Sequence, residues 1–424
     1  MSRVIFFIRP MYGHVYPTIE LVKELARRGE KVIYYTIEEF QKIIESAGAA
    51  CRFYADSGAR LNIGAKIEVP GNETVNTLKG QVEKIFLKLS AHMEDVGNQE
   101  KELYAEIKAE KPDYIVYDYI NAFWGKMLAQ KLDVPAIASS SSFATCEELV
   151  DVDPVGCIKY VLYMSPHDPF FKNNPSMVKD LIDFISYRIE SAYNIKNFNM
   201  LNFGNSQLLN IVYTSRYFQP YGEIFDHTFT FAGCSIGARP GDIDFPYEKL
   251  DKKPMIFISL GTNFNRRVDF YKECFEAFKT TDKQVVLSVG NRIDLAELGD
   301  IPGNFIIKRF VPQLEILKRA ALFITHGGLN SVSEGIYYNV PLIVFPQQGD
   351  QFSVGHQVNR LGAGICFEKP GVTAGELRKA AEEIFSNEKF RENCRKIKES
   401  FEHAGGMKKV VDEIFKLKEK IGIQ

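Results

Sequence analysis

The second half of the chain alternates short apolar runs with amphipathic stretches, and this alternation restricts the fold more than any other feature. The runs PMIFISLGT (254–262) and AALFITHGG (320–328) read as strands, while FYKECFEAFK (270–279) and LNSVSEGIYYN (329–339) have the apolar spacing of helices. Strands that alternate with helices form parallel sheets with helices on both faces. The second half is therefore predicted to be a doubly wound α/β domain, followed from Thr373 by helices alone.

The first half begins with the same pattern. Residues 4–8 form an apolar run, a Gly-His loop follows, and PTIELVKELARRG is predicted to be a helix that Pro17 opens and Gly29 ends. The run KVIYYTI (31–37) reads as the next strand, so a strand, helix and strand open a second parallel sheet. Further strands are predicted at KPDYIVYD (111–118) and VPAIASSSS (134–142).

A segment rich in proline, glycine and charge separates the two patterns. Residues 219–254 show no periodic apolar spacing, which is typical of a linker. A chain of 424 residues also exceeds what one core usually supports. We predict two domains, residues 1–222 and 251–405, joined by a linker at 223–250 and followed by a C-terminal helix at 406–424.

Composition excludes several classes of function. The 52 basic residues are balanced by 54 acidic ones, so no global positive charge exists to hold nucleic acid, and small molecules become the expected partners. The seven cysteines show no CxxC spacing, which argues against a disulfide framework or a zinc site and favours the cytoplasm. The apolar run before Arg9 is too short for a signal peptide or a membrane span.

Acidic pairs are the only pattern that resembles a metal site. Asp151 with Asp153 and Asp242 with Asp244 have the Asp-x-Asp spacing of a carboxylate pair that can hold a metal. Each pair lies in a sequence context typical of a loop or linker. We interpret both pairs as solvated acids and predict no metal site.

The stretch THGGLNSVSEG follows a strand with groups that suit an anion. Ligands of open parallel sheets bind at the carboxyl ends of strands, near the starts of helices. Gly327 and Gly328 would let a ligand approach the backbone, and the N–H groups of the next helix, with Asn330 and Ser331, would donate to a phosphate. Serine and glycine at a helix start are also common caps, which is the alternative interpretation.

Other polar residues are predicted to converge on the same edge of the sheet. Glu334, one turn into the helix, can accept hydrogen bonds from sugar hydroxyls, or it can be an ordinary exposed glutamate favoured by the helix dipole. Thr262 ends another strand and could donate to a phosphate. Asp350 and Gln351 suit the vicinal hydroxyls of a hexose, although Asp350 alone could be an N-cap.

In the first half, a histidine and an aspartate end two strands of the same sheet. His14 lies after the first strand and before Pro17, where the helix dipole disfavours its charged form, so it can accept a proton. Asp118 closes the strand 111–118 and could orient the imidazole and stabilise its protonated form. The pair predicts a general base and its partner. A structural role in the loop is the alternative for His14.

The run FVPQLEILKRAALFITHGGLNSVSEGIYYNVPLIVFPQQGDQ (310–351) resembles the donor-binding signature of the family 1 glycosyltransferases, which include bacterial macrolide glycosyltransferases and UDP-glycosyltransferases of plants and animals. A Gly-His loop, a PDxIVxD strand and a SLGT loop extend the resemblance to the whole chain. It implies a GT-B fold: two tandem Rossmann-like domains, the first for the acceptor and the second for the donor, with the last helix crossing back to the first. The matching signature residues are Pro312, Gln313, His326, Gly327, Gly328, Ser331, Glu334, Pro341, Pro346, Asp350 and Gln351.

The resemblance also implies how a nucleotide would be held. Val311 and Gln313 would contact the uracil, and Glu334 the ribose. The family signature often begins with Trp, and Phe310 keeps an aromatic ring there that can stack on the base. The diphosphate would be held by Thr262, His326, Asn330 and Ser331, and Gly13 and Gly328 complete the implied donor-binding set.

For the sugar and the reaction, the resemblance implies that Asp350 and Gln351 bind the glucose hydroxyls, which favours UDP-glucose as donor. His14 would be the general base and Asp118 its partner. The expected reaction is an inverting glucosyl transfer that needs neither a metal nor a cofactor besides the donor substrate.

The aromatic residues between 145 and 220 suggest a small hydrophobic acceptor such as a phenol, a flavonoid or a macrolide, although they would also build an ordinary core. Two other functions compete with this one. A UDP-sugar epimerase of related architecture would alter the donor without an acceptor. A non-catalytic partner protein would have no use for an intact His14 and donor motif.

Overall fold

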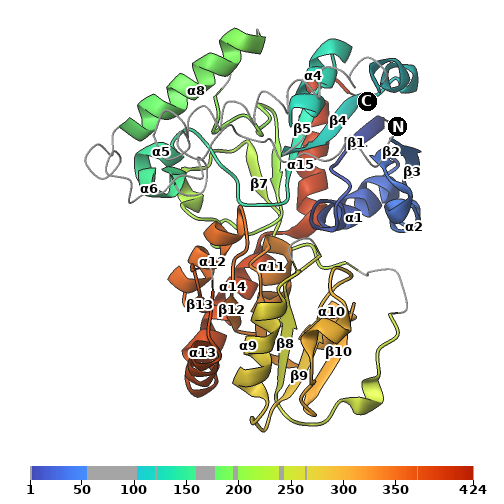
Figure 1. Ribbon diagram of the computed structural model, residues 1–424. Coiled ribbons are helices and arrows are strands. Elements are labelled where there is room, and N and C mark those ends of the chain that lie inside the picture. Colours follow the sequence, from blue (N-terminus) through green and yellow to red (C-terminus); the bar gives the residue numbers. More distant parts are fainter. Residues whose placement is uncertain are drawn as a thin grey trace. The chain divides into compact units, whose positions relative to one another are not determined.

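The computed structural model separates the chain into two compact units (Figure 1). The first contains Met1–Tyr213, Tyr221–Gly237 and Gly405–Gln424, and the second contains Thr214–Pro220 and Ala238–Ala404. Within these units the structure describes residues 2–54, 103–119, 122–158, 177–193, 199–237, 243–262, 265–369 and 371–423.

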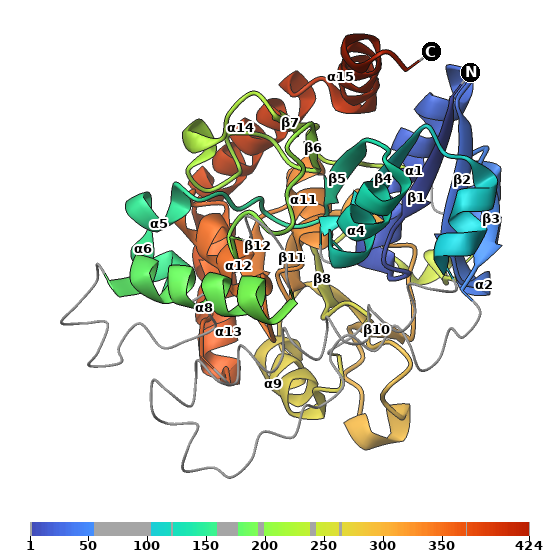
Figure 2. The same ribbon diagram turned by 90° about the horizontal axis from the view of Figure 1, so that it is seen from above.

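The first unit is built on a seven-stranded parallel sheet of order β3-β2-β1-β4-β5-β6-β7, whose central strands Figure 2 shows side by side. Its central strand β4 is buried along its whole length, as expected for a parallel sheet covered on both faces. The strands are β1 (Arg3–Phe7), β2 (Lys31–Thr36), β3 (Ala50–Phe53), β4 (Tyr114–Asp118), β5 (Ala136–Ser140), β6 (Asn210–Val212) and β7 (Phe229–Phe231).

Alternate residues of β1 enter two separate cores, because successive side chains of a strand point to opposite faces. Val4 and Phe6 pack in a core with helix α1 (Tyr12–Arg27) and the last helix α15 (Gly406–Ile421). Ile5 and Phe7 pack on the other face, in a core with α4 (Ala122–Leu132). Other helices of this unit are α2 (Glu38–Ser46), α5 (Leu149–Val152), α6 (Pro154–Gly156), α8 (Met177–Tyr193) and the 3-10 turn η4 (Gly222–Ile224).

The second unit is built on a six-stranded parallel sheet of order β10-β9-β8-β11-β12-β13. Its strands are β8 (Met255–Ser259), β9 (Gln284–Ser288), β10 (Phe305–Lys308), β11 (Ala320–Thr325), β12 (Leu342–Val344) and β13 (Gly364–Cys366). Its helices are α9 (Val268–Phe278), α10 (Gln313–Leu317), α11 (Leu329–Tyr337), α12 (Gln351–Arg360), α13 (Ala374–Ser386) and α14 (Lys389–His403), with 3-10 turns η5 (Tyr247–Lys249) and η6 (Leu295–Leu298).

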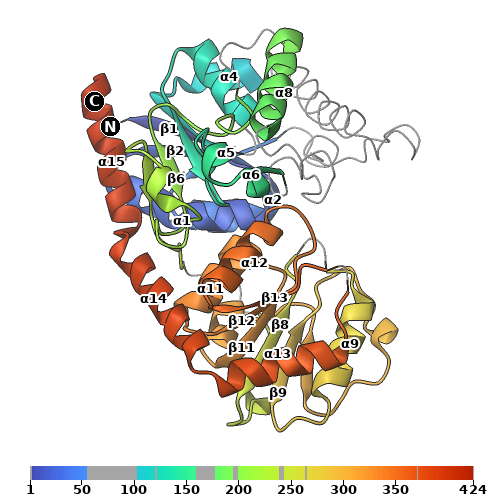
Figure 3. The ribbon, with the colours of Figure 1, turned by 90° about the vertical axis from the view of Figure 1, so that its left-hand side faces the viewer.

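Helix α15 follows α14 in sequence but belongs to the first unit, where it packs against α1 (Figure 3). It buries Val410, Val411 and Ile414 in the core that α1 shares, which stabilises the docked helix by about 5 kcal/mol. The expectation that the last helix crosses back to the first domain is confirmed.

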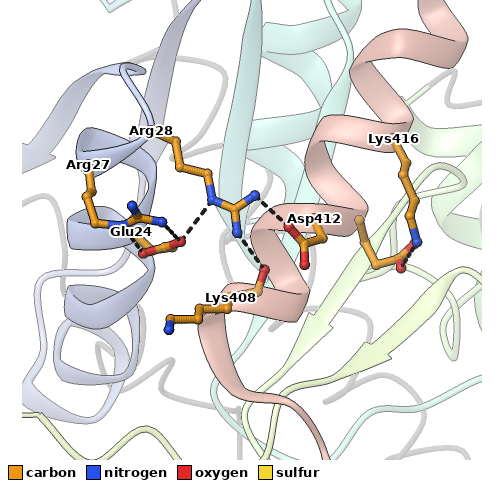
Figure 4. A network of polar contacts seen from close by, with 7 residues as sticks. Glu24, Arg27, Arg28, Lys408, Asp412 and Lys416 are labelled. Carbon is orange, nitrogen blue, oxygen red and sulfur yellow. Dashed lines mark hydrogen bonds and ion pairs between the residues drawn. The ribbon is translucent and has the colours of Figure 1, made fainter.

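Ion pairs hold the same helix. Arg28 Nη1 donates to Asp412 Oδ1 at 2.5 Å and Arg28 Nη2 to the carbonyl of Lys408 at 3.3 Å (Figure 4). Arg27 and Arg28 also donate to Glu24, whose pKa they lower to about 2. These contacts tie α15 to the end of α1.

A buried ion pair lies farther along α15. Lys418 Nζ donates to Glu30 Oε1 at 2.6 Å, and Tyr114 Oη donates to Glu30 Oε2 at 3.0 Å. The side chains of Lys418 and Glu30 are 7% and 3% exposed, so removing either would leave a buried charge unpaired.

The α/β class is confirmed, and local features differ from the sequence analysis in three places. The short strands β3, β6 and β7 were not predicted, and β7 lies in the segment expected to be a linker. Helix α1 begins at Tyr12 rather than Pro17. Pro17 is accommodated because it lies in the second turn, where the missing N–H costs a single bond near the helix start.

Candidate active site

The first unit places two titratable residues where its strand order reverses. β1 lies between β2 and β4, so the connections that leave β1 and β4 run in opposite directions along the sheet. Ligands of open parallel sheets bind outside the carboxyl ends of the strands at such a point. His14 lies in the first turn of α1, directly after β1. Asp118 is the last residue of β4. The topology therefore brings together residues that are 104 positions apart in sequence.

His14 and Asp118 form a short hydrogen bond. His14 Nδ1 lies 2.6 Å from Asp118 Oδ2, and the two side chains are 13% and 2% exposed. A carboxylate can only accept, so the proton of this bond belongs to Nδ1. In the neutral imidazole, Nε2 then keeps its lone pair and can accept a proton.

Ser141 completes this cluster and was missed by the sequence analysis. Its Oγ lies 2.9 Å from the same Nδ1 of His14. Ser141 directly follows β5, which pairs with β4, so its hydroxyl is delivered to the same sheet edge. The signal was a run of four serines at the end of a predicted strand, which could have drawn attention to this edge.

Buried polar residues surround Asp118. Burial lowers the pKa of Arg9, and the charge of Asp118 partly opposes that effect. Burial raises the pKa of Tyr213, and Asp118 raises it further, while the Tyr213 hydroxyl lies 3.0 Å from Ser139 Oγ. The carboxylate thus lies among groups that remain protonated at neutral pH.

In the second unit, helix α11 begins at the predicted anion site. Gly328 is its N-cap residue, and no side chain makes a capping hydrogen bond. The start of a helix is a place where backbone N–H groups can bind an anion. Asn330 and Ser331 lie in the first turn. The alternative interpretation of this stretch as a helix cap is confirmed for glycine, whereas no serine caps the helix.

The imidazole of His326 fills the space beside two glycines. A Cβ on Gly261 would lie 2.6 Å from Cε1 of the ring, and one on Gly328 would lie 2.6 Å from Nε2. Burial lowers the pKa of His326 to about 4, although a hydrogen bond to the backbone of Ser259 opposes the shift in part. His326 is therefore neutral at physiological pH.

The glycines of this turn are also required by packing within the protein. Gly327 has a φ of +90°, and a Cβ there would meet Val344 Cγ1 at 2.7 Å and the carbonyl oxygen of Gln351 at 2.9 Å. Neighbouring protein atoms therefore require both Gly327 and Gly328 to lack a side chain.

Three of the predicted nucleotide-binding residues contact one another. Gln313, the first residue of α10, donates from Nε2 to Glu334 Oε2 at 2.6 Å and approaches Ser331 Oγ at 3.4 Å. Glu334 is 4% exposed, so its alternative interpretation as an exposed helical glutamate is wrong. The hydrogen bond from Gln313 orients the Glu334 carboxylate and so fixes the position of its other oxygen, Oε1.

The two residues predicted to bind a hexose differ in their surroundings. Gln351 is 8% exposed, and its Oε1 accepts the N–H groups of Gln347 at 2.8 Å and Gln348 at 3.1 Å. This oxygen therefore holds the loop, which leaves only the amide nitrogen for a sugar hydroxyl. Asp350 occupies the N-cap position of α12, but its side chain makes no capping hydrogen bond, so that alternative role is not observed.

The remaining predicted residues lie at accessible or backbone positions. Phe310 is 44% exposed, as a ring that stacks on a base must be, whereas the side chain of Val311 is buried and leaves its backbone for contact. Thr262 is exposed after β8. Gly13 lies in α1 of the first unit, apart from the other predicted donor-binding residues, which all belong to the second unit.

The described residues of the two acidic pairs have different surroundings. Asp153 Oδ1 accepts the N–H of Gly156 at 2.8 Å, and Asp244 is fully exposed beside Lys308. Asp242 lies outside the described residues. Within the described residues, no group of three or more His, Cys, Asp or Glu side chains could hold a metal ion. The helices described are also too short or too polar to cross a membrane.

Solved structures share this architecture along the whole chain. The calicheamicin glycosyltransferase CalG4 superposes with a TM-score of 0.73 and 25% identity, over 99% of both chains. The glycosyltransferase of kitacinnamycin superposes with the same score and identity, over 98% of this chain and 99% of its own. Fold and sites together define a glycosyltransferase with the GT-B fold.

Sequence comparisons narrow the class. Residues 272–417 match the model of the erythromycin biosynthesis protein CIII-like C-terminal domain. The uncharacterized UDP-glucosyltransferase YojK of Bacillus subtilis strain 168 is 36% identical over 98% of this chain and 97% of its own. The NDP-glycosyltransferase YjiC of the same strain is 35% identical over 96% of this chain and 94% of its own. Demethyllactenocin mycarosyltransferase of Streptomyces fradiae is 27% identical over 98% and 86%. The chain belongs to the macrolide glycosyltransferase-like family 1 glycosyltransferases.

Proposed function

We propose that this glycosyltransferase moves glucose from UDP-glucose to a hydroxyl of a small hydrophobic acceptor, with inversion and without a metal, and that His14 is its general base. The observation that carries the proposal is the 2.6 Å bond from His14 Nδ1 to Asp118, which leaves Nε2 able to take a proton. Neither the epimerase nor the non-catalytic alternative needs such a base facing an acceptor.

In the proposed reaction, His14 Nε2 removes the proton of the acceptor hydroxyl while the oxygen attacks the anomeric carbon. The bond from that carbon to the diphosphate oxygen breaks, and UDP leaves with the bonding electrons. Asp118 stabilises the imidazolium that forms. One displacement converts the α-linked donor into a β-glucoside.

The residues at the start of α11 would stabilise the leaving group. The uncapped N–H groups of its first turn, with Asn330 and Ser331, are hydrogen-bond donors where a diphosphate would gain charge. A neutral His326 can add an N–H without the cost of a buried cation. Thr262 is a further candidate donor.

The choice of UDP-glucose rests on the signature residues and on relatives. Gln313 and Glu334 are held together as partners for a base and a ribose, and Phe310 is open for stacking. Asp350 is the strongest candidate to accept from glucose hydroxyls, because Oε1 of Gln351 is already engaged. YojK, which is 36% identical, is described as an uncharacterized UDP-glucosyltransferase.

The choice of a hydrophobic acceptor rests on the first unit and on the macrolide-type relatives. Phe184 and Tyr187 of α8 are 51% and 65% exposed, whereas other apolar residues of the same region form an ordinary core with Leu181 and Ile185. Part of the aromatic content is therefore accessible and part is structural.

Mass spectrometry of a panel of phenols, flavonoids and macrolides, incubated with UDP-glucose and the protein, tests the proposal. We expect acceptors to gain one hexose, the gain to disappear in His14→Ala, and chelation of divalent metals to leave the rate unchanged. His227→Ala is the matched control, since that side chain is 92% exposed.

Other results would contradict the proposal in distinct ways. A gain that persists at full rate in His14→Ala would remove His14 as the base. A changed UDP-sugar in the absence of any acceptor would favour the epimerase. A gain from dTDP-glucose alone would correct the nucleotide and leave the base assignment standing.

A further inference from the structure

Arg267 is anchored in three directions beside the predicted donor site. It is the N-cap residue of α9, in the loop that follows β8. Its Nε and Nη2 donate to the two carboxylate oxygens of Asp269 at 3.0 and 2.8 Å, and its guanidinium lies 5.1 Å from the centre of the Phe345 ring. The third guanidinium nitrogen, Nη1, donates to Gln347 Oε1 at 2.6 Å.

Gln347 belongs to the loop that carries the predicted sugar-binding residues. This loop joins β12 to α12 and contains Asp350 just before Gln351. Gln347 Nε2 donates to the carbonyl of Phe345 at 2.8 Å, and its backbone N–H donates to Gln351 Oε1 at 2.8 Å. A chain of hydrogen bonds thus leads from Arg267 through Gln347 to Gln351.

The contact between Arg267 and Gln347 is stronger than an ordinary surface contact. Asp269 raises the pKa of Arg267, so the guanidinium stays charged, and its side chain is only 26% exposed. Hydrogen bonds from a charged donor are about twice as strong as neutral ones. Two of its five donors are fixed by Asp269, which leaves the fork little freedom to turn away from Gln347.

We infer that Arg267 is a positioning residue for the sugar half of the donor: it holds the loop between β12 and α12 so that Asp350 and Gln351 face the hexose. The inference rests on the proposed function, in which these two residues bind glucose. Gln313 and Glu334, the predicted partners of the nucleotide, are held instead by their own contact between α10 and α11. Arg267 should therefore affect sugar recognition and spare nucleotide recognition.

The test compares UDP with UDP-glucose by calorimetric titration of the whole protein, together with kcat and KM for UDP-glucose. In Arg267→Ala we expect the affinity for UDP to stay within about twofold of wild type, and the affinity for UDP-glucose to fall about tenfold. Arg267→Lys should recover part of the loss, because lysine keeps the charge near Gln347 but cannot form the fork with Asp269.

Two further variants separate positioning from a general effect. Gln347→Ala should reproduce the loss of affinity for UDP-glucose. The double variant of Arg267→Ala and Gln347→Ala should lose less than about twofold more, because both substitutions remove the same hydrogen bond. Arg266→Ala is the matched control: it removes the neighbouring arginine, whose side chain is 69% exposed and lies 3.9 Å from Glu297, and it should leave both affinities unchanged. The melting temperatures of all variants check that they fold.

The results that overturn the inference differ from those that overturn the proposed function. Equal losses of UDP and UDP-glucose affinity in Arg267→Ala, or no loss of either, overturn the inference alone. A wild-type protein that binds UDP but gains nothing from the glucose overturns both. A selective loss in Arg267→Ala and Gln347→Ala that is absent from Arg266→Ala supports the inference.

Discussion

The two units place different residues at the same point of the same topology. In each sheet the central pair of strands marks the reversal of order, β1 beside β4 in the first and β8 beside β11 in the second. In the first unit this point carries His14 after β1 and Asp118 at the end of β4. In the second it carries Gly261 after β8 and His326 after β11.

The residues that surround His14 and His326 determine the chemical role that each imidazole can have. Asp118 lies 2.6 Å from the imidazole of His14 and accepts the proton on Nδ1, which leaves Nε2 as the proton acceptor. The glycines 261 and 328 bring protein atoms against His326 without any charge, and burial lowers its pKa to about 4. One fold thus supplies a histidine suited to accept a proton and another suited to remain a neutral hydrogen-bond donor.

The largest expected effect comes from removing the charge that distinguishes the two sites. Asp118→Asn keeps the shape but cannot stabilise an imidazolium, so we expect kcat to fall about 10²- to 10³-fold while the affinity for UDP is unchanged. Steady-state kinetics and titration with UDP measure the two quantities.

Asp133→Asn is the control for that variant. Asp133 is exposed in the turn after α4 with a φ of +53°, a conformation that asparagine also adopts. If Asp118→Asn retained more than about a tenth of wild-type kcat, the negative charge of Asp118 would not be what distinguishes His14 from His326.

A smaller expected effect concerns the pH dependence of stability and tests His326 in the second unit. The folded pKa of His326, about 4, lies below its ordinary value of 6.5, so the unfolded chain takes up the proton first. Stability from this site is complete above pH 6.5 and is lost as pH falls toward 4, by about 3 kcal/mol in total.

Urea unfolding at a series of pH values measures this loss. His326→Asn should flatten the decline between pH 6.5 and 4 relative to wild type, because it removes the titrating group. If the unfolding free energy of the variant fell with pH as steeply as that of wild type, protonation of His326 would not be the cause of the decline.

The smallest expected effect is that of Ser141→Ala. Ser141 Oγ lies 2.9 Å from the nitrogen that already donates to Asp118, so it steadies the imidazole without supplying charge. We expect kcat to fall by about threefold, the cost of one neutral hydrogen bond. A loss as large as that of Asp118→Asn would make Ser141 an equal partner of the base; the pH profile of kcat/KM in both variants distinguishes the two cases.

Sequence reasoning succeeded where a site is contiguous. The donor motif lies within residues 310–351, so its pattern could be read directly, and Gln313, Ser331 and Glu334 do contact one another. His14 and Asp118 could be paired across 104 residues because His14 follows one strand of a parallel sheet and Asp118 ends another. The edge at which such strands end is predictable from strand direction.

The features that were missed depend on packing. β3, β6 and β7 have only three or four residues, too few for a periodic signal. Ser141 and Arg267 gain their importance from neighbours on other strands and loops. The purpose of Gly328 is set by the His326 ring beside it, which no local pattern reveals.

The position of α15 also has a consequence for biosynthesis. A ribosome makes residues 405–424 after the whole second unit, yet their buried Val410, Val411 and Ile414 belong to the core that begins with β1. Until these residues leave the ribosome, that face of the nascent first unit stays uncovered and Glu30 lacks its ammonium partner, while every segment of the second unit has already been synthesised. The first unit can therefore complete its core only after the second unit has been made.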